Sequence, residues 1–274
     1  MSLLESTTSS LLLPYNQPLE KGTFLKRYNR FLVDVKRTDG RIETIHCANT
    51  GSMKSCLQEG APVYTLPSNN PQRLLKSSLE LMELEDGYVC VNTMRANQVV
   101  EAWLKSEEGR MALGCTPSPY PPLLKREALY EEGTRFDFLL QWTNAWKEEH
   151  QTWVEVKSVS MRQEQPEGEP YWAFPDAVTL RGQKHLHALA TAGQTKRHNA
   201  WLIFVMMRGS QHPPALLRSR FRIAAEIDPV YHQTLKSYLE QRKLRIGLLV
   251  PSLSLEGFGL REFYKLPLST LTDL

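Results

Sequence analysis

Apolar and polar residues alternate along several short segments in the first third of the chain. Phe31, Val33 and Val35 occupy every second position, which is the period of a β-strand. A Thr-Asp-Gly turn at residues 38–40 follows, and residues 42–47 are expected to return as the next strand of a hairpin. Further short strands are expected at residues 61–66, 79–84 and 88–91. Closely spaced short strands favour a small barrel, first of the oligonucleotide-binding (OB) type, with an SH3-like barrel left open.

The pattern becomes helical after residue 96. Val99, Val100 and Trp103 follow helical spacing, so we expect a helix over residues 97–104 with Asn97 as its N-cap. Several prolines then interrupt the chain between residues 117 and 122. Strands are expected at residues 127–130, 135–142 and 152–159. The Glu-, Gln-, Pro- and Gly-rich residues 161–170 predict an exposed loop.

The last hundred residues pass between helical and strongly apolar segments. We expect a helix over residues 180–192, an apolar strand over 200–207, a helix from Pro229 after Asp228, and a last strand over 245–250. Strands joined through helices predict a mixed sheet with helical crossovers. The expected fold class is therefore α+β, with an OB-like barrel at residues 15–90 and an α/β domain with a mixed central sheet at residues 91–274.

Length and composition agree with a two-domain globular protein. The chain has 274 residues, of which 41% are hydrophobic and 23% charged. Its longest apolar run, residues 200–207, is far shorter than the roughly 20 residues of a membrane span, so no membrane partner is expected. None of the four cysteines belongs to a Cys-x-x-Cys pair, which argues against a zinc site and favours free thiols in the cytoplasm.

Positive charge is concentrated in two regions, although the net charge is only +3. Residues 15–76 contain ten Lys or Arg against five Asp or Glu. Residues 177–225 contain eight Lys or Arg, four His and no carboxylate. Such segregation suits a polyanionic partner better than a uniformly mixed surface does.

One aspartate and a Glu-x-Lys pair suggest the chemistry. Asp137 lies between Phe136 and Phe138 in an expected strand, and the two rings should take the opposite face. Glu155 and Lys157 lie two apart in the next strand and therefore share a face. A charged residue among large apolar neighbours is costly unless it is paired or binds a metal. Two carboxylates and a lysine in this order are the arrangement of PD-(D/E)xK nucleases, whose carboxylates bind Mg²⁺.

Longer blocks of sequence strengthen this interpretation. They are LKRYNRFLVDV at 25–35, HCANTGSM at 46–53, VNT at 91–93, VEVKSV at 154–159, FPDAVT at 174–179 and RGQKHL at 181–186. Together they resemble the sugar fermentation stimulation protein A (SfsA) family, over about residues 22–250. The chain departs from that family at Ala48, where Pro is common, at Leu180, where Glu is common, and in a longer loop over residues 161–172.

The resemblance implies an OB-like domain followed by a PD-(D/E)xK nuclease-like domain. It also implies DNA binding with little sequence preference and a role in regulating sugar, especially maltose, metabolism. The family's catalytic positions fall on Asp137, Glu155 and Lys157, with Asp137 and Glu155 as ligands of Mg²⁺ or Mn²⁺. Glu101 stands where many such nucleases place a further carboxylate. Gln183, at the first turn of a helix, is positioned to meet a phosphate.

Basic side chains in both halves are candidate DNA contacts. Lys26, Arg27 and Arg30 are interleaved with aromatic residues, a mixture that suits phosphate binding and base stacking, although Phe24 and Phe31 would serve equally as barrel core. The complete set of candidates is Lys26, Arg27, Arg30, Lys54, Arg181 and Lys184.

Three further polar residues, two histidines and one aspartate, have alternative structural and functional interpretations. His185 and His187 lie two apart on an expected helix and do not share a face, so a metal pair is disfavoured and core packing or phosphate contact is expected for both. Asp176 either caps the helix that follows or approaches the site.

Two classes of function remain open from the sequence. The first is an enzyme, a Mg²⁺-dependent deoxyribonuclease of PD-(D/E)xK type. The second is a non-catalytic DNA-binding regulatory factor on a nuclease-like fold. The expected partner is DNA, double-stranded first and single-stranded as an alternative, and no helix-turn-helix pattern predicts recognition of one operator. No pattern determines the oligomeric state.

Overall fold

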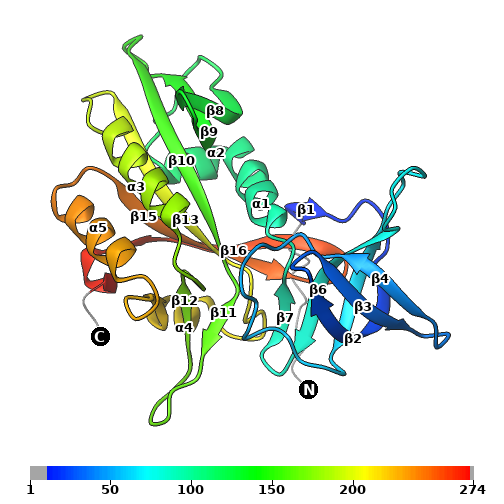
Figure 1. Cartoon of the computed structure of the whole chain (residues 1–274). Helices are drawn as coiled ribbons and strands as arrows, with labels where there is room; N and C mark the ends of the chain where they lie inside the picture. Colours follow the sequence, from blue (N-terminus) through cyan, green and yellow to red (C-terminus); the bar gives the residue numbers. More distant parts are fainter. Residues whose placement is uncertain (1–10, 272–274) are drawn as a thin grey trace, which may run out of the picture.

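The computed structural model describes residues 11–271 and contains a small barrel beside a larger sheet covered by helices (Figure 1). The barrel strands are β2 (Glu20–Tyr28), β3 (Leu32–Arg37), β4 (Ile42–His46), β5 (Pro62–Pro67), β6 (Ser77–Leu84) and β7 (Gly87–Cys90). They are paired in the order β4-β3-β2-β5-β6-β7, and a further pairing of β4 with β6 closes five of them into a barrel. The expected OB domain is confirmed.

The barrel core follows the predicted alternation, with one exception. Val33 and Val35 are fully buried, and Phe24 from β2 packs with them. Phe31 is 45% exposed, so its assignment to the alternating strand is wrong. The reason is a tight turn: Asn29 and Arg30 adopt positive φ angles, and β3 begins only at Leu32.

The second domain is built on a mixed sheet, as the sequence predicts, and this sheet has seven strands. Its strands are β1 (Leu13–Pro14), β8 (Leu123–Glu131), β9 (Thr134–Thr143), β10 (Glu149–Val159), β13 (His198–Met206), β15 (Arg245–Leu253) and β16 (Gly257–Leu266). The order is β1-β16-β15-β13-β10-β9-β8. The three central strands β10, β13 and β15 run parallel, and the outer pairings are antiparallel.

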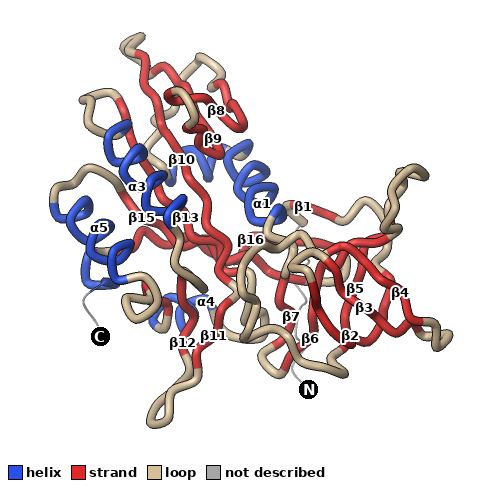
Figure 2. The backbone as a smooth tube through the Cα atoms, in the orientation of Figure 1, coloured by secondary structure: helices blue, strands red, loops and turns tan. Residues whose placement is uncertain are grey.

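Helices cover both faces of this sheet (Figure 2). They are α1 (Met94–Lys105), α2 (Glu107–Ala112), α3 (Leu180–Ala192), α4 (Pro214–Ser219), α5 (Pro229–Glu240) and a short 3-10 helix (Leu268–Leu271). Apolar side chains of α1 pack on one face, and those of α3 and α5 pack on the other. Between residues 11 and 271, no helix is long and apolar enough to cross a membrane.

Several boundaries differ from the sequence-based prediction. Helix α1 begins at Met94 after Thr93, so Asn97 lies within the helix and the prediction that it is the N-cap is wrong. Strand β11 (Met161–Gln163) takes the start of the expected loop and forms a small sheet with β12 (Tyr171–Phe174) and β14 (Phe221–Ile223). The strand at 245–250 is not the last, because β16 returns beside it and also pairs with the N-terminal β1.

Buried polar contacts join the barrel to the second domain. Arg208, which follows β13, donates from Nε to Oδ2 of Asp86 at 2.8 Å, and both side chains are almost fully buried. Its Nη1 donates to the carbonyl oxygen of Ser55 at 2.8 Å. The amide of Cys90 donates to the carbonyl of Met207 at 2.8 Å. These contacts fix the barrel against the end of the central strand.

Candidate active site

Asp137 lies where β9 and β10 stop pairing. The ladder between these strands ends at Val154 opposite Phe138. Beyond it, the amide of Val156 donates to Oδ2 of Asp137 at 2.7 Å. The Asn97 side chain of α1 donates from Nδ2 to Oδ1 of Asp137 at 2.6 Å. The aspartate is therefore held between the middle of β10 and the first turns of α1.

The strand around Asp137 is irregular, and one expectation fails here. Phe136 packs in the core beneath α3 and Phe138 in the core beneath α1, so the two rings do not share a face. In the neighbouring β8, Ala128 pairs with Phe136 and Arg126 pairs with Phe138, while Glu127 between them has a φ of 45°. A residue in this left-handed region breaks the regular pleat directly opposite Asp137.

Glu155 and Lys157 share one face of β10, as their spacing predicts. Glu155 is only 5% exposed, and its Oε1 accepts a hydrogen bond from Lys157 Nζ at 2.6 Å. His185 Nδ1 on α3 lies 2.9 Å from the same oxygen. His185 was expected to pack in the core or to contact a phosphate; its side chain is largely buried beside the Glu155 carboxylate, a partner that the sequence did not predict.

The electrostatics of the two carboxylates differ. Burial and, to a smaller extent, the nearby charge of Glu155 raise the pKa of Asp137 to about 6. The hydrogen bonds from Val156 and Asn97 lower this pKa, but by less than burial raises it. Burial would also raise the pKa of Glu155, but the adjacent Lys157 and the His185 hydrogen bond outweigh it and lower that pKa. Glu155 is thus held as a carboxylate, while Asp137 carries a charge that its surroundings disfavour.

Two other predicted site residues are engaged elsewhere. Glu101, on α1, pairs with Lys105 at 2.9 Å and with Arg126 at 3.3 Å. Gln183 donates from Nε2 to Oδ1 of Asp228 at 2.9 Å. Asp228 is buried and caps α5 by accepting the amide of Tyr231. Among the described residues, neither Glu101 nor Gln183 bonds to the Asp137, Glu155 and Lys157 cluster.

The candidate DNA contacts on the barrel have different surroundings. Lys26 is exposed and lies 3.6 Å from Asp34, and Arg30 is exposed in the turn before β3. Arg27 points inward instead: its guanidinium donates to the carbonyl oxygens of residues 49, 51 and 52. Lys54 is exposed and lines a groove of about 620 Å³ between the two domains.

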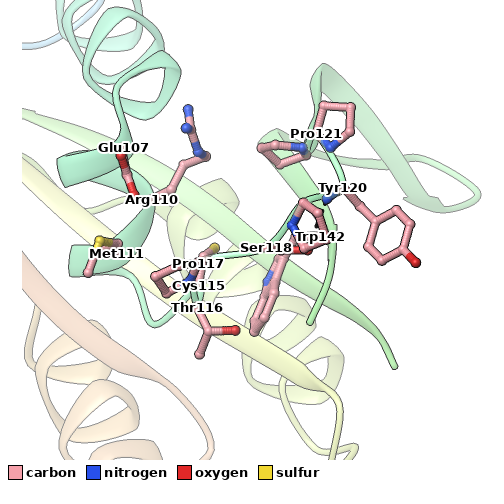
Figure 3. A pocket seen from close by; sticks show the side chains of 12 residues that line it. Glu107, Arg110, Met111, Cys115, Thr116, Pro117, Ser118, Tyr120, Pro121 and Trp142 are labelled. Carbon is pink, nitrogen blue, oxygen red and sulfur yellow. Dashed lines mark hydrogen bonds between the residues drawn. The ribbon is translucent and has the colours of Figure 1, made fainter. Parts of the chain in front are cut away.

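Two hollows are lined by the residues that bond to Glu155, one by His185 and the other by Lys157. A basic hollow of about 700 Å³ is lined by exposed Arg181 and Lys184 of α3 together with His185 and Arg135. A smaller interdomain pocket of about 340 Å³ is lined by Lys157 and by the barrel segment at residues 49–51. A further hollow of about 370 Å³ lies beneath the proline-rich segment and holds none of the candidate catalytic residues (Figure 3).

The wall of the interdomain pocket depends on Asp176. Its Oδ2 accepts the amide of Ser52 at 2.9 Å, and the Ser52 hydroxyl donates to the same carboxylate at 3.3 Å. Asp176 therefore does not cap α3, whose N-cap is Thr179. A Cβ on Gly51 would lie 2.5 Å from Asp176 Oδ2, so any larger residue at position 51 would have to displace this carboxylate from Ser52.

Sequence reasoning missed the roles of Asn97 and His185. Their partners, Asp137 and Glu155, lie 40 and 30 positions away, and no local pattern signals such a contact. Within residues 11–271, no group of three or more His, Cys, Asp or Glu side chains is arranged to hold a metal ion. Any cation here would therefore depend on Asp137 and Glu155 with water or substrate oxygens.

Comparison with known proteins gives the same family for both halves of the chain. The model of the sugar fermentation stimulation protein RE domain matches residues 94–245, and that of the SfsA N-terminal OB domain matches residues 25–91. The sugar fermentation stimulation protein homolog of Pseudomonas putida (strain W619) is 40% identical over 225 residues, which are 80% of this chain and 84% of that one. The homolog of Pseudomonas aeruginosa (strain LESB58) is 39% identical over 224 residues, 81% of this chain and 86% of that one.

A solved structure supports the same assignment. Pyrococcus furiosus SfsA in complex with Ca²⁺ superposes with a TM-score of 0.71 at 25% sequence identity. The alignment covers 91% of this chain and 95% of that one. On the family matches and the shared architecture, the chain belongs to the sugar fermentation stimulation protein family.

Proposed function

We propose that this protein is a divalent-metal-dependent nuclease that acts on DNA with little sequence preference. One observation carries the proposal: Asp137 Oδ2 accepts the amide of Val156, which lies between Glu155 and Lys157 on β10, and Lys157 Nζ is 2.6 Å from Glu155 Oε1. Hydrolysis of a phosphodiester needs a cation, a bound water and a positive group near the developing charge, and this cluster offers a place for each.

The residues present fit a hard cation. Asp137 and Glu155 supply oxygen ligands of the kind that Mg²⁺, Mn²⁺ and Ca²⁺ prefer, and a related SfsA from Pyrococcus furiosus has been solved with Ca²⁺. Burial and, to a smaller extent, the nearby charge of Glu155 raise the pKa of Asp137, and a bound cation would offset both. Both bonds to Glu155 end on Oε1, which would leave Oε2 for a cation. When bound, Mg²⁺ or Mn²⁺ would polarise the phosphodiester and lower the pKa of a water.

The surroundings of the cluster suit a nucleic acid strand. Arg181 and Lys184 are exposed beside His185, in a hollow that adjoins Glu155. Lys26 and Arg30 add positive charge on the barrel. Phosphate contacts of this kind hold DNA without reading its sequence. We place the activity in the cytoplasm, because all four cysteines are free and buried, as in proteins of reducing compartments.

The test is cleavage of supercoiled plasmid in Mg²⁺ or Mn²⁺. Wild type should nick or linearise the plasmid, and EDTA should stop the reaction. Lys157→Met should lose the cleavage, while Lys36→Met, which removes an exposed barrel lysine on β3, should retain it. Equal activity of the Lys157→Met variant and wild type would remove the cluster from catalysis.

A second candidate function is a non-catalytic DNA-binding factor in sugar, especially maltose, metabolism. It is favoured by the small number of carboxylates that are available to bind a metal ion. Glu101, the expected further carboxylate, is instead paired with Lys105 and Arg126. This alternative predicts that the wild-type protein binds DNA through the same phosphate contacts but does not cleave it when metal is added. The plasmid assay, run beside a binding measurement, separates the two.

A further inference from the structure

We infer that the interdomain pocket beside Lys157 binds one unpaired nucleotide at the end of a DNA strand, so that the substrate is single-stranded ends or overhangs. The inference rests on the proposed function, since it concerns the substrate of the same cluster. The pocket is lined by residues from the barrel, α1, β10 and β12, among them Thr50, Met94, Lys157, Ser158 and Phe174.

The volume of the pocket limits the size of the group that can bind in it. Its volume of about 340 Å³ lies at the low end of the roughly 300–1,000 Å³ of small-ligand pockets. A single nucleotide is of that order, whereas a stacked base pair is not. A strand whose phosphate reaches Lys157 from this side must therefore present a nucleotide that is not paired.

The lining of the pocket suits a nucleoside rather than a phosphate. Thr50 and Ser158 bring hydroxyl groups that can donate or accept hydrogen bonds. Met94 is 56% exposed at the start of α1, and Phe174 is half-buried on β12, so both give soft apolar surface for the face of a base. Apart from Lys157, no cationic side chain of the described residues lines it.

Phosphates have a separate place in the basic hollow. The basic hollow carries Arg181 and Lys184 on its exposed rim and reaches His185. Lys157 from the pocket and His185 from the basic hollow bond to the same oxygen of Glu155, so the two hollows approach each other at this carboxylate. A strand can run with its phosphates along α3, pass Asp137 and Glu155, and place its terminal nucleoside in the pocket.

The pocket is held open by fixed contacts. Arg27 binds the carbonyl oxygens of Asn49, Gly51 and Ser52 from within the barrel. Asp176 binds the amide of Ser52 from the second domain. The barrel turn thus cannot collapse onto Lys157, and its recognition surface exists before DNA binds, which limits the cost of ordering. This arrangement also gives Arg27 a role in shaping the pocket.

The experiment measures binding, so that it does not depend on cleavage. Full-length protein in Ca²⁺ is titrated with two fluorescent duplexes, one blunt and one with a four-nucleotide overhang. Because flipping out a paired nucleotide costs unpairing energy, wild type should bind the overhang at least about tenfold more tightly. Thr50→Trp fills the pocket and should abolish this preference, whereas Thr38→Trp, on an exposed hairpin turn of the same barrel, should retain it.

A second variant tests the same inference in case Thr50→Trp does not fold. Met94→Glu puts a carboxylate at the pocket mouth, where it repels a phosphate, and in the first turn of α1, where negative charge stabilises the helix. It should also remove the overhang preference while leaving affinity for blunt DNA within about twofold. A preference that persists in both folded variants, or a wild type that binds both duplexes equally, overturns the inference.

The outcomes separate this inference from the proposed function. Overhang preference that Thr50→Trp removes, in a protein that cuts no DNA in Mg²⁺, supports the pocket and overturns the nuclease. Metal-dependent cleavage that Lys157→Met abolishes, with no discrimination between blunt and overhanging DNA, supports the nuclease and overturns the pocket.

Discussion

Replacing Asp137 with Asn should stabilise the metal-free protein at pH 8 while removing its response to metal. The folded protein raises the pKa of this carboxyl from 3.8 to about 6, a shift of about two units. At 1.36 kcal/mol per unit, the ionised side chain costs about 3 kcal/mol of folding free energy. At about 2–4 °C per kcal/mol for a chain of this size, the variant should melt about 6–12 °C higher.

The sign follows from proton binding. A carboxyl whose pKa is raised by folding binds its proton more tightly in the folded state, so its contribution to stability is fully present below pH 3.8. That contribution is lost as the pH rises through about 6, the folded-state pKa of Asp137. The advantage of Asp137→Asn should therefore appear between about pH 4 and 6 and be complete at pH 8.

The hydrogen bonds of the site accommodate asparagine. The new carbonyl oxygen can accept the Val156 amide, which now donates to Oδ2 of Asp137. The new amide group can donate to Asn97, whose side-chain amide turns to present its oxygen in place of Nδ2. Both hydrogen bonds that Asp137 now makes can therefore be replaced, which limits the loss of stability from the substitution.

The assay is thermal unfolding of both proteins at pH 5 and pH 8, with and without Ca²⁺. Wild type should gain stability on adding Ca²⁺ at pH 8, and Asp137→Asn should not. The matched control is Asp86→Asn, since that buried carboxylate is paired with Arg208 at 2.8 Å. Its loss should destabilise the fold by about 3–5 kcal/mol. A lower melting temperature for Asp137→Asn at pH 8, or a pH profile like that of wild type, would refute the reasoning.

Three further predictions address the neighbouring residues. Lys157→Met should reduce metal-dependent cleavage about 100-fold or more, because it removes the positive group beside the carboxylates, yet DNA affinity by anisotropy should change little; a parallel loss of binding would contradict a catalytic role. Lys184→Ala should weaken DNA binding for unrelated sequences alike and lower the slope of log affinity against log salt by about one unit, and an unchanged slope would exclude a phosphate contact there. Gln183→Ala should lower the free energy of unfolding in urea by about 1.5–3 kcal/mol, because it removes the hydrogen bond to buried Asp228, and it should not affect Ca²⁺ binding. Loss of Ca²⁺ binding at unchanged stability would instead assign Gln183 to the metal site.

Much of the architecture was predictable because it depends on residues close in sequence. Helix α3 occupies residues 180–192 as expected, and α5 begins at Pro229 with Asp228 as its cap. The two-residue period of a strand is enough to place Glu155 and Lys157 on one face of β10. Alternation likewise buries Val33 and Val35 in the barrel.

The predictions that failed depend on where the chain turns. Phe31 is exposed because the turn at residues 29–30 delays the start of β3. Asn97 is a plausible cap by residue type, but α1 starts three residues earlier and turns its amide toward Asp137. Strand β16 was not anticipated, although it completes the sheet beside β15. Helix and strand limits of this kind are set by long-range packing as much as by local preference.

The sequence by itself determined the two-domain α+β class, the family, and the Asp, Glu and Lys that could serve a nuclease. Only the tertiary structure decided which groups surround them. It joined His185 to Glu155 and Asn97 to Asp137, and it paired Gln183 with Asp228. The physical reason is distance along the chain: periodicity orients a side chain relative to its own strand or helix, whereas a partner 30 to 45 positions away depends on how whole elements pack.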